Sequence, residues 1–172
     1  TPERIVAGIM TGTSVDAGDV AIVKMYGTGE QLRIDLLHYS ETLFAEELQQ
    51  RLFANMEVSS SNINDICLLH TALAHAFADA VREACTEGGL EVSDLHLIGM
   101  HGQTMRHLPE AMELAGVPVR STLQLGSAPT LATLLDVPVV SDFRCGDMIL
   151  GGQGAPLVPR VDWLLFRSEQ EH

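Results

Sequence analysis

Positive charge is scarce in this chain of 172 residues. Lysine and arginine together number 10 against 23 aspartates and glutamates, so the formal net charge at pH 7 is −13. A protein that binds nucleic acid needs basic stripes that replace the counterions of the phosphate backbone. The composition therefore argues against nucleic acid as a partner, although a few main-chain N–H groups are enough to hold a single nucleotide.

Cysteines are few, and long apolar runs are missing. The three cysteines are Cys67, Cys85 and Cys145. Their odd number and the lack of CxxC or metal-ligand spacing indicate reduced thiols in a cytoplasmic protein, without a metal cluster. No leader sequence is visible, and the apolar stretch at residues 68–80 is interrupted by two histidines and an aspartate. We therefore expect no membrane partner.

The apolar content is nevertheless sufficient for a core. Hydrophobic residues make up 46% of the chain, and the length predicts a single domain over residues 1–172. Short links predict an antiparallel meander of three strands over residues 4–10, 20–25 and 32–38. Two helices are predicted next, one over residues 43–56 and one that begins at Ile63 and is stopped by Gly88-Gly89.

The remainder alternates between strand and helix. Apolar strands are predicted over residues 95–100, 121–126 and 137–140, with a helix that begins at Ser127 between the last two. Such strands belong to a parallel sheet covered by helices on both faces. His70, on the apolar stripe of the long helix, is interpreted as a packed, hydrogen-bonded histidine rather than a ligand or base.

The segment Thr11–Asp19 joins the first two predicted strands. Its two glycines allow a tight turn, its hydroxyls and main-chain N–H groups suit phosphate oxygens, and its carboxylates suit magnesium or its waters. No lysine is present, so the segment is not a Walker loop. An ordinary hairpin turn of the same composition is the alternative interpretation.

Two further polar segments follow predicted strands. His101-Gly102-Gln103-Thr104 follows the strand at residues 95–100, and residues 141–156 follow the strand at residues 137–140. Ligands in such sheets bind beyond the carboxyl ends of the strands. The three glycines of residues 151–154 indicate that something approaches that backbone closely. Amide side chains such as those of Gln103 and Gln153 suit a sugar, so a sugar phosphotransferase is the hypothesis from the residues alone.

Five motifs then resemble those of anhydro-N-acetylmuramic acid kinases, in the order of that family and over nearly the whole chain. They are Gly12-Thr13-Ser14-Val15-Asp16-x-x-Asp19, Gly99-x-His101-Gly102-Gln103-Thr104-x-x-His107, Thr122-Leu123-Gln124-x-Gly126, Val140-x-Asp142-Phe143-Arg144-x-x-Asp147 and Gly151-Gly152-Gln153-Gly154-Ala155-Pro156-Leu157-Val158-Pro159. The resemblance implies a ribonuclease-H-like lobe of the actin/Hsp70/sugar-kinase type. It also implies a bacterial cytoplasmic enzyme that uses MgATP to open the anhydro ring and to phosphorylate O6, giving N-acetylmuramic acid 6-phosphate.

The same resemblance implies roles for individual residues. The ATP phosphates would be held by Gly12, Thr13, Ser14, Val15, Asp16, Ala17, Gly18 and Asp19, with Asp16 near Mg²⁺ through water. The sugar would be held by His101, Gln103, Thr104, Arg144, Gln153, Gly154 and Ala155.

The resemblance assigns no catalytic residue to this segment. The family's general base and more of its nucleotide site lie in a second half, whose characteristic strings do not occur in this chain. We therefore expect the general base beyond His172, the last residue of the sequence. It follows that the chain is expected to be an N-terminal lobe that lacks a second lobe and does not turn over by itself.

Two departures from the family pattern are visible. The family's Asp-Gly-x-Asp is replaced by Asp16-Ala17-Gly18-Asp19, so the turn is strained if Ala17 occupies a position with positive φ. Arg144 is followed by Cys145-Gly146 rather than by further arginines, which removes positive charge near an acidic sugar.

A homodimer along the apolar stripe is a further hypothesis. The alternative functions are a non-catalytic binding or assembly module and a metal-dependent nuclease that uses Asp16, Asp19 and Asp142.

Overall fold

A mixed five-stranded sheet forms the centre of the molecule. The computed structural model describes residues 3–167. The strands are β1 (Arg4–Thr11), β2 (Ala17–Tyr26), β3 (Arg33–Leu43), β4 (Leu97–Met100) and β7 (Val139–Val140), in the order β3-β2-β1-β4-β7. β2 pairs antiparallel with β1 and β3, while β4 pairs parallel with β1 and β7. The first three strands therefore follow one another along the sheet, and the later two extend it at the β1 side.

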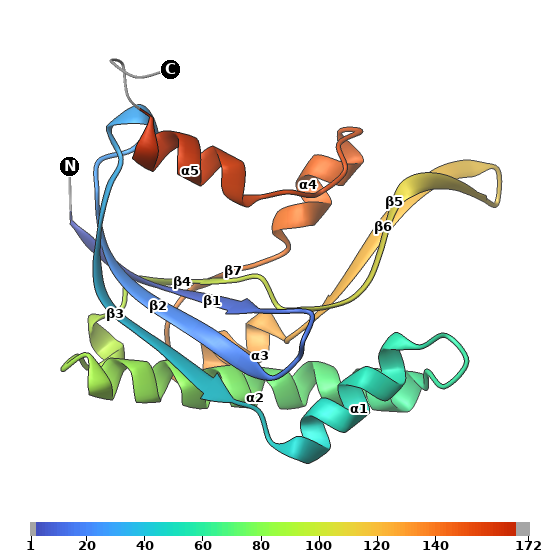
Figure 1. Cartoon of the computed structure of the whole chain (residues 1–172), viewed down its shortest axis with the longest axis horizontal. Helices are drawn as coiled ribbons and strands as arrows, with labels where there is room; N and C mark the ends of the chain where they lie inside the picture. The colour runs from blue at the N-terminus through green and yellow to red at the C-terminus, as the bar shows by residue number, and fades with distance from the viewer. Residues whose placement is uncertain (1–2, 168–172) are drawn as a thin grey trace.

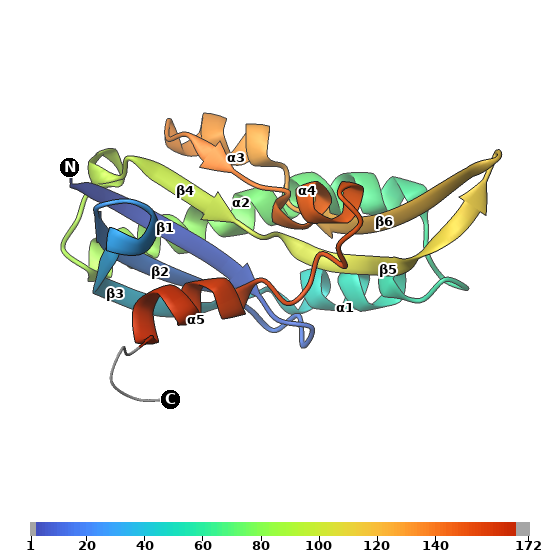
Figure 2. The ribbon, with the colours of Figure 1, turned by 90° about the horizontal axis from the view of Figure 1, so that it is seen from above.

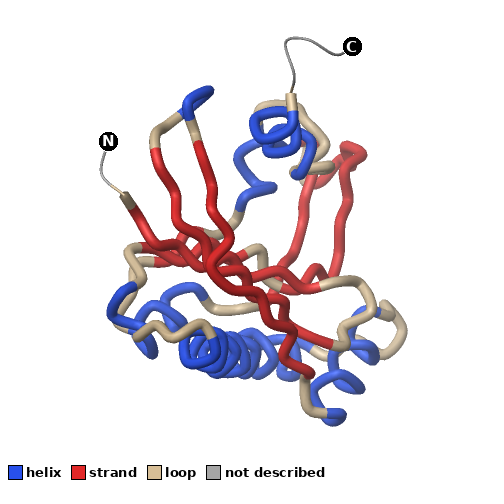
Figure 3. Tube along the Cα trace, turned by 60° about the vertical axis from the view of Figure 1, so that its left-hand side comes forward, coloured by secondary structure: helices blue, strands red, loops and turns tan. Residues whose placement is uncertain are grey.

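Helices lie on both sides of this sheet (Figures 1 and 3). On one side are α1 (Glu46–Met56), α2 (Ile63–Glu87) and α3 (Ala128–Leu135), and on the other α4 (Phe143–Ile149) and α5 (Val158–Phe166). Two short 3₁₀ helices, Gly29–Gln31 and Val92–Asp94, complete the described elements. No helix among residues 3–167 is long and apolar enough to span a membrane.

The strand expected at residues 121–126 does not join the sheet. It is the end of β6 (Val117–Leu125), which pairs antiparallel with β5 (Gln103–Leu114) in a separate two-stranded hairpin. Figure 2 shows this hairpin extending away from the sheet. Ala115 and Gly116 both have positive φ at its tip, as a tight two-residue turn requires. A strand does cover residues 121–125, but the prediction that it belongs to the parallel sheet was wrong.

The core lies between the sheet and α2. Leu73, Phe77 and Ala80 of the predicted stripe are fully buried, whereas Ile63 at the start of the helix is 76% exposed. The Phe77 ring lies 6.2 Å from that of Phe44, centre to centre. A Cβ on Gly126, where φ is +123°, would lie only 2.7 Å from Phe77. A glycine before α3 thus makes room for the largest side chain of the core, and in doing so sets the path of the chain from β6 to α3.

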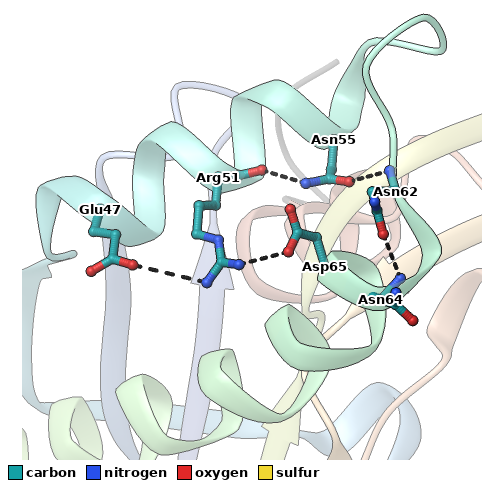
Figure 4. Close-up of polar contacts among 6 residues, drawn as sticks. All are labelled: Glu47, Arg51, Asn55, Asn62, Asn64 and Asp65. Carbon is teal, nitrogen blue, oxygen red and sulfur yellow. Dashed lines mark hydrogen bonds and ion pairs between the residues drawn. The ribbon is translucent and has the colours of Figure 1, made fainter.

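Polar contacts fix the junction between α1 and α2 (Figure 4). The Asn55 amide donates to the Arg51 carbonyl and accepts from the Asn62 N–H, both at 2.8 Å. Asn62 caps α2 by accepting from the Asn64 N–H at 2.8 Å. Arg51 pairs with Asp65 at 2.6 Å. These contacts orient α1 against the long helix on which the core is built.

Candidate functional site

The turn between β1 and β2 contacts the loop that follows β4. The Thr11 hydroxyl donates to the Gly102 carbonyl at 3.1 Å, and the Gln103 amide donates to the Gly12 carbonyl at 3.2 Å. Because β1 and β4 are parallel neighbours, their carboxyl ends meet at one edge of the sheet. Two of the three polar segments that the sequence singled out are therefore joined directly, at the edge where such sheets bind ligands.

The turn itself is shorter than the sequence segment. Ala17, Gly18 and Asp19 already belong to β2, and Ala17 is paired with Leu43 of β3. The residue with positive φ is Val15, at +56°, not Ala17. The strain considered for Ala17 is thus absent. Val15 is fully buried, and its N–H donates to the Gly12 carbonyl at 3.3 Å, which closes the turn.

Ser14 and Asp16 form a polar pair on the exposed side of the turn. The Ser14 hydroxyl donates to Asp16 Oδ1 at 2.6 Å. This hydrogen bond lowers the pKa of the Asp16 carboxyl below its ordinary value of 3.8, and main-chain N–H groups act in the same direction. Asp16 is therefore ionised at neutral pH and accessible. One carboxylate can hold the waters of a magnesium ion, but the described residues contain no group of three side chains that could bind a metal directly.

Asp19 is engaged elsewhere. Its Oδ1 accepts from the Tyr39 hydroxyl on β3 at 2.6 Å. This bond to the carboxylate raises the pKa of Tyr39 above 10.0. Because no third acidic side chain joins either Asp16 or Asp19 within residues 3–167, the three-carboxylate site expected of a nuclease, with Asp142, is not formed.

Gln103 is the most deeply buried polar side chain of the site. It is 0% exposed, and its Nε2 donates to the carbonyls of Gly12 and Thr104, at 3.2 and 3.4 Å. Two carbonyl acceptors fix which end of the amide is nitrogen. Its Oε1 has no hydrogen-bond partner among the described residues. Thr104 is half-buried, and its hydroxyl accepts from Gln124 at 3.4 Å.

Arg144 reaches from α4 to the same loop. Its Nε donates to His101 Nε2 at 3.0 Å, and its Nη1 donates to the Gly154 carbonyl at 2.7 Å. The other ring nitrogen of His101, Nδ1, lies 2.8 Å from the Gly102 carbonyl. Burial first, and then the nearby guanidinium, lower the pKa of His101 below 6.5 against the effect of that carbonyl. A neutral ring that donates from Nδ1 and accepts at Nε2 satisfies both contacts.

The partners of Arg144 are therefore neutral. Within residues 3–167 this half-buried guanidinium makes no ion pair with a carboxylate. A partly buried cation bonded only to uncharged acceptors favours an anionic ligand. Cys145 and Gly146, the departure from the family pattern, are exposed on α4 beside Arg144.

The glycine-rich loop is approached by a residue that the sequence did not assign to the site. Asp147 Oδ2 accepts from the Gly154 N–H at 2.7 Å, and the Asp147 carbonyl accepts from the Gly152 N–H at 2.9 Å. The sequence carries a signal for this contact, because Asp147 follows Arg144 by about one helical turn and so lies on the same face. Gly154 is buried, whereas Gln153 and Ala155 are exposed beside it.

A pocket of about 300 Å³ adjoins His101 at the ends of β4 and β7. Its lining includes His70, Gln124 and Asp142, none of which was predicted as a site residue of the kinase. His70 is half-buried and its Nδ1 accepts from the Gly126 N–H at 3.2 Å, in agreement with its interpretation as a hydrogen-bonded packing residue. His101, Gln103, Arg144 and Gly154 thus lie together, while Gln153, Ala155 and the turn residue Thr13 are presented at the surface.

The described residues do not locate the general base. His172, beyond which the sequence places that group, lies outside the described residues 3–167. The general base beyond His172 therefore stays a prediction. What the described residues form is a set of contacts suited to binding and orienting ligands.

Comparison with known proteins identifies one family. The family model described as anhydro-N-acetylmuramic acid kinase matches residues 4–172. Curated relatives that carry this name include those of Caldanaerobacter subterraneus subsp. tengcongensis, Salinibacter ruber and Bacillus cereus, at 40%, 42% and 38% identity. These alignments cover 97–98% of this chain but only 42–43% of each relative. The chain therefore spans less than half the length of the relatives it matches.

Proposed function

The chain belongs to the anhydro-N-acetylmuramic acid kinase family, and from that membership we propose that it is the N-terminal lobe of an ATP-dependent kinase of that amino sugar. In the proposed reaction, water adds at the anomeric carbon and opens the 1,6-anhydro ring. The freed O6 then attacks the γ-phosphorus of ATP, and ADP leaves. The products are N-acetylmuramic acid 6-phosphate and ADP.

One observation carries the proposal most strongly: the contact between the Gly12 turn and the loop after β4. The Gln103 amide bonds to the Gly12 carbonyl, so a group proposed to contact phosphate and a group proposed to contact sugar are held in one unit. Phosphoryl transfer depends on the relative position of donor and acceptor more than on covalent chemistry by the protein. A side chain that joins the two subsites supports that requirement.

We assign the nucleotide to the segment Gly12–Asp19. The exposed hydroxyls and N–H groups of residues 12–14 would bind phosphate oxygens, and the ionised Asp16 would hold a water of the Mg²⁺ ion. Val15, Ala17 and Gly18 would act by holding the shape of the turn, because the Val15 N–H donates to the Gly12 carbonyl and the other two are paired within the sheet. When bound, MgATP supplies the phosphoryl group, and these residues orient its phosphates.

We assign the sugar to His101, Gln103, Thr104, Arg144 and the segment Gln153–Ala155. Anhydro-N-acetylmuramic acid carries a carboxylate, and the guanidinium of Arg144, which has only neutral partners among the described residues, suits it. The exposed Gln153 side chain offers both a donor and an acceptor for hydroxyl or amide groups of the sugar.

The order of the sheet supports a ribonuclease-H-like lobe. Three antiparallel strands are followed by parallel ones, and the site lies at the carboxyl ends of β1 and β4. In kinases of this type ATP lies between two lobes. We therefore propose that the part of the relatives outside these alignments supplies the second wall and the general base.

A coupled assay of ADP release tests the proposal. With MgATP and the anhydro sugar, we expect no turnover by this chain alone. We expect sugar-dependent turnover when the remaining part of a relative is added, and at least about a tenfold loss for Arg144→Ala in that mixture, because a charge-assisted contact is removed. Turnover by the chain alone would contradict the proposal of a single lobe, and failure of the mixture to use the sugar would contradict the proposed substrate.

Neither alternative function is favoured by an observation. The altered hairpin that motivated a non-catalytic module is accommodated without strain at Ala17. The nuclease requires three clustered carboxylates that the described residues do not provide.

A further inference from the structure

Two side chains of α4 form hydrogen bonds to the main chain of Gly154, one to its N–H and the other to its carbonyl. Asp147 accepts from its N–H at 2.7 Å, and Arg144 donates to its carbonyl at 2.7 Å. The two side chains are three residues apart, so they project from neighbouring positions on the helix. One helix therefore holds both polar groups of a single loop residue.

The glycines of the loop are explained by this contact. A Cβ on Gly152 would overlap the Asp147 carboxylate. A Cβ on Gly154, where φ is +68°, would lie 2.8 Å from Met148 Cγ and 3.1 Å from Arg144 Cβ. The close approach that the glycine content demands thus comes from α4, and above all from Asp147. A bound ligand is not needed to account for it.

The contact continues to the end of β4. Arg144 Nε donates to His101 Nε2 at 3.0 Å, and the His101 ring is held in turn by the Gly102 carbonyl at 2.8 Å. Asp147 is thus connected through Gly154 and Arg144 to His101. Displacing Gly154 removes one of the two bonds that orient the guanidinium.

We propose that Asp147 is a positioning residue for the sugar subsite: by holding Gly154 it sets the direction of the Arg144 guanidinium and of the exposed Gln153 side chain. The inference rests on the proposed function in that the ligand is taken to be the anhydro sugar. Asp147 does not itself touch the ligand. It acts through Gly154, which lies between it and Arg144.

The test uses the ¹⁵N-labelled chain, at 18.6 kDa well suited to NMR, with 1,6-anhydro-N-acetylmuramic acid as the probe. Asp147→Ala is expected to weaken binding about tenfold, the effect of one lost hydrogen bond. It is also expected to accelerate exchange of the Gly154 amide and to shift the His101 ring nitrogens. Asp147→Asn keeps an oxygen acceptor and is expected to restore most of all three signals. Asp162→Asn, on α5, is the matched control and is expected to change none of them.

Two results would overturn the inference. One is an Asp147→Ala variant that binds the sugar as the parent does. The other is an unchanged Gly154 exchange rate and His101 spectrum in that variant. If the parent chain does not bind the sugar, binding requires the second lobe, and the Gly154 and His101 signals alone decide the role of Asp147. Should Asp147→Ala fail to fold, Asp147→Ser, whose hydroxyl is too short to reach Gly154, takes its place.

Discussion

At the scale of the residue, short polar contacts set the charge state of the candidate site. Asp16 is held ionised by the hydroxyl of Ser14, and His101 is held neutral by burial and by Arg144. Both effects lower a pKa, which keeps Asp16 an anion beside the proposed magnesium ion and keeps His101 a neutral acceptor for Arg144.

Ser14→Ala tests the first of these contacts. Removing the hydroxyl donor is expected to raise the pKa of Asp16 toward 3.8, because the hydrogen bond from Ser14 is the largest cause of its depression. The measurement is titration of the Asp16 carboxyl carbon by NMR in both proteins. Thr13→Ala, which leaves the contact between Ser14 and Asp16 in place, is the control. An unchanged Asp16 pKa in Ser14→Ala would contradict the contact.

The pH dependence of His101 tests the second contact, between His101 and Arg144. Its pKa in the folded protein lies below the ordinary value of 6.5, so the unfolded chain binds the proton more readily. The contribution of His101 to stability is therefore present above about pH 6.5 and is lost as the pH falls through its folded pKa. Histidine ring titration by NMR should give a midpoint below 6.5 for His101. Arg144→Lys, which changes the guanidinium geometry and its contact to Nε2, is expected to move that midpoint, and a midpoint above 6.5 in the parent would show the assignment to be wrong.

At the scale of the element, the sequence predicted the helices and strands that bury a regular apolar face, and also β3, which has no buried residue but follows a clear turn. β1, β2 and α2 follow this rule, because their alternating or helical pattern is imposed by contact with one core. β5 lacks such a face, since its outer half is exposed, and its sequence therefore predicts no strand. α4 was missed because it is only seven residues long and has Cys145 and Gly146, two weak helix formers, at its centre. α5 carries one recognisable start signal, a proline in its first turn.

Asn55→Ala tests the junction between α1 and α2. Asn55 is 6% exposed and bonds to the main chain at both ends of its amide (Figure 4). Its loss removes two part-buried hydrogen bonds, each worth about 1 kcal/mol, so we expect the free energy of unfolding to fall by about 2 kcal/mol. Urea denaturation provides the measurement. Asn64→Ala, in which the bonded atom is the retained main-chain nitrogen, is expected to change stability by less than about 0.5 kcal/mol. Equal losses in the two variants would argue against the role of the Asn55 amide.

At the scale of the whole molecule, the net charge of −13 is expected to lower the stability of the fold. Like charges repel within a compact chain, and salt screens that repulsion over about 10 Å at 0.1 M. Raising NaCl from about 20 to about 300 mM is therefore expected to raise the Tm by roughly 2–4 °C, the shift that about 1 kcal/mol produces in a chain of this size. Thermal unfolding followed by circular dichroism measures it, with equal osmolarity of sucrose as the comparison. A Tm that falls with added salt would be inconsistent with this picture.

The sequence by itself determined the family, the strands and helices around the core, and three polar segments at strand ends. These features depend on local pattern and on residue order, which a linear chain displays. The tertiary structure alone decided that Gln103 contacts Gly12, that Arg144 rests on His101, and that Asp147 rather than a ligand fills the space beside Gly152. Each of these contacts joins residues brought together by the pairing of β1 with β4 or by the path of α4. Their partners depend on how separate elements pack, and residue type and spacing do not record that.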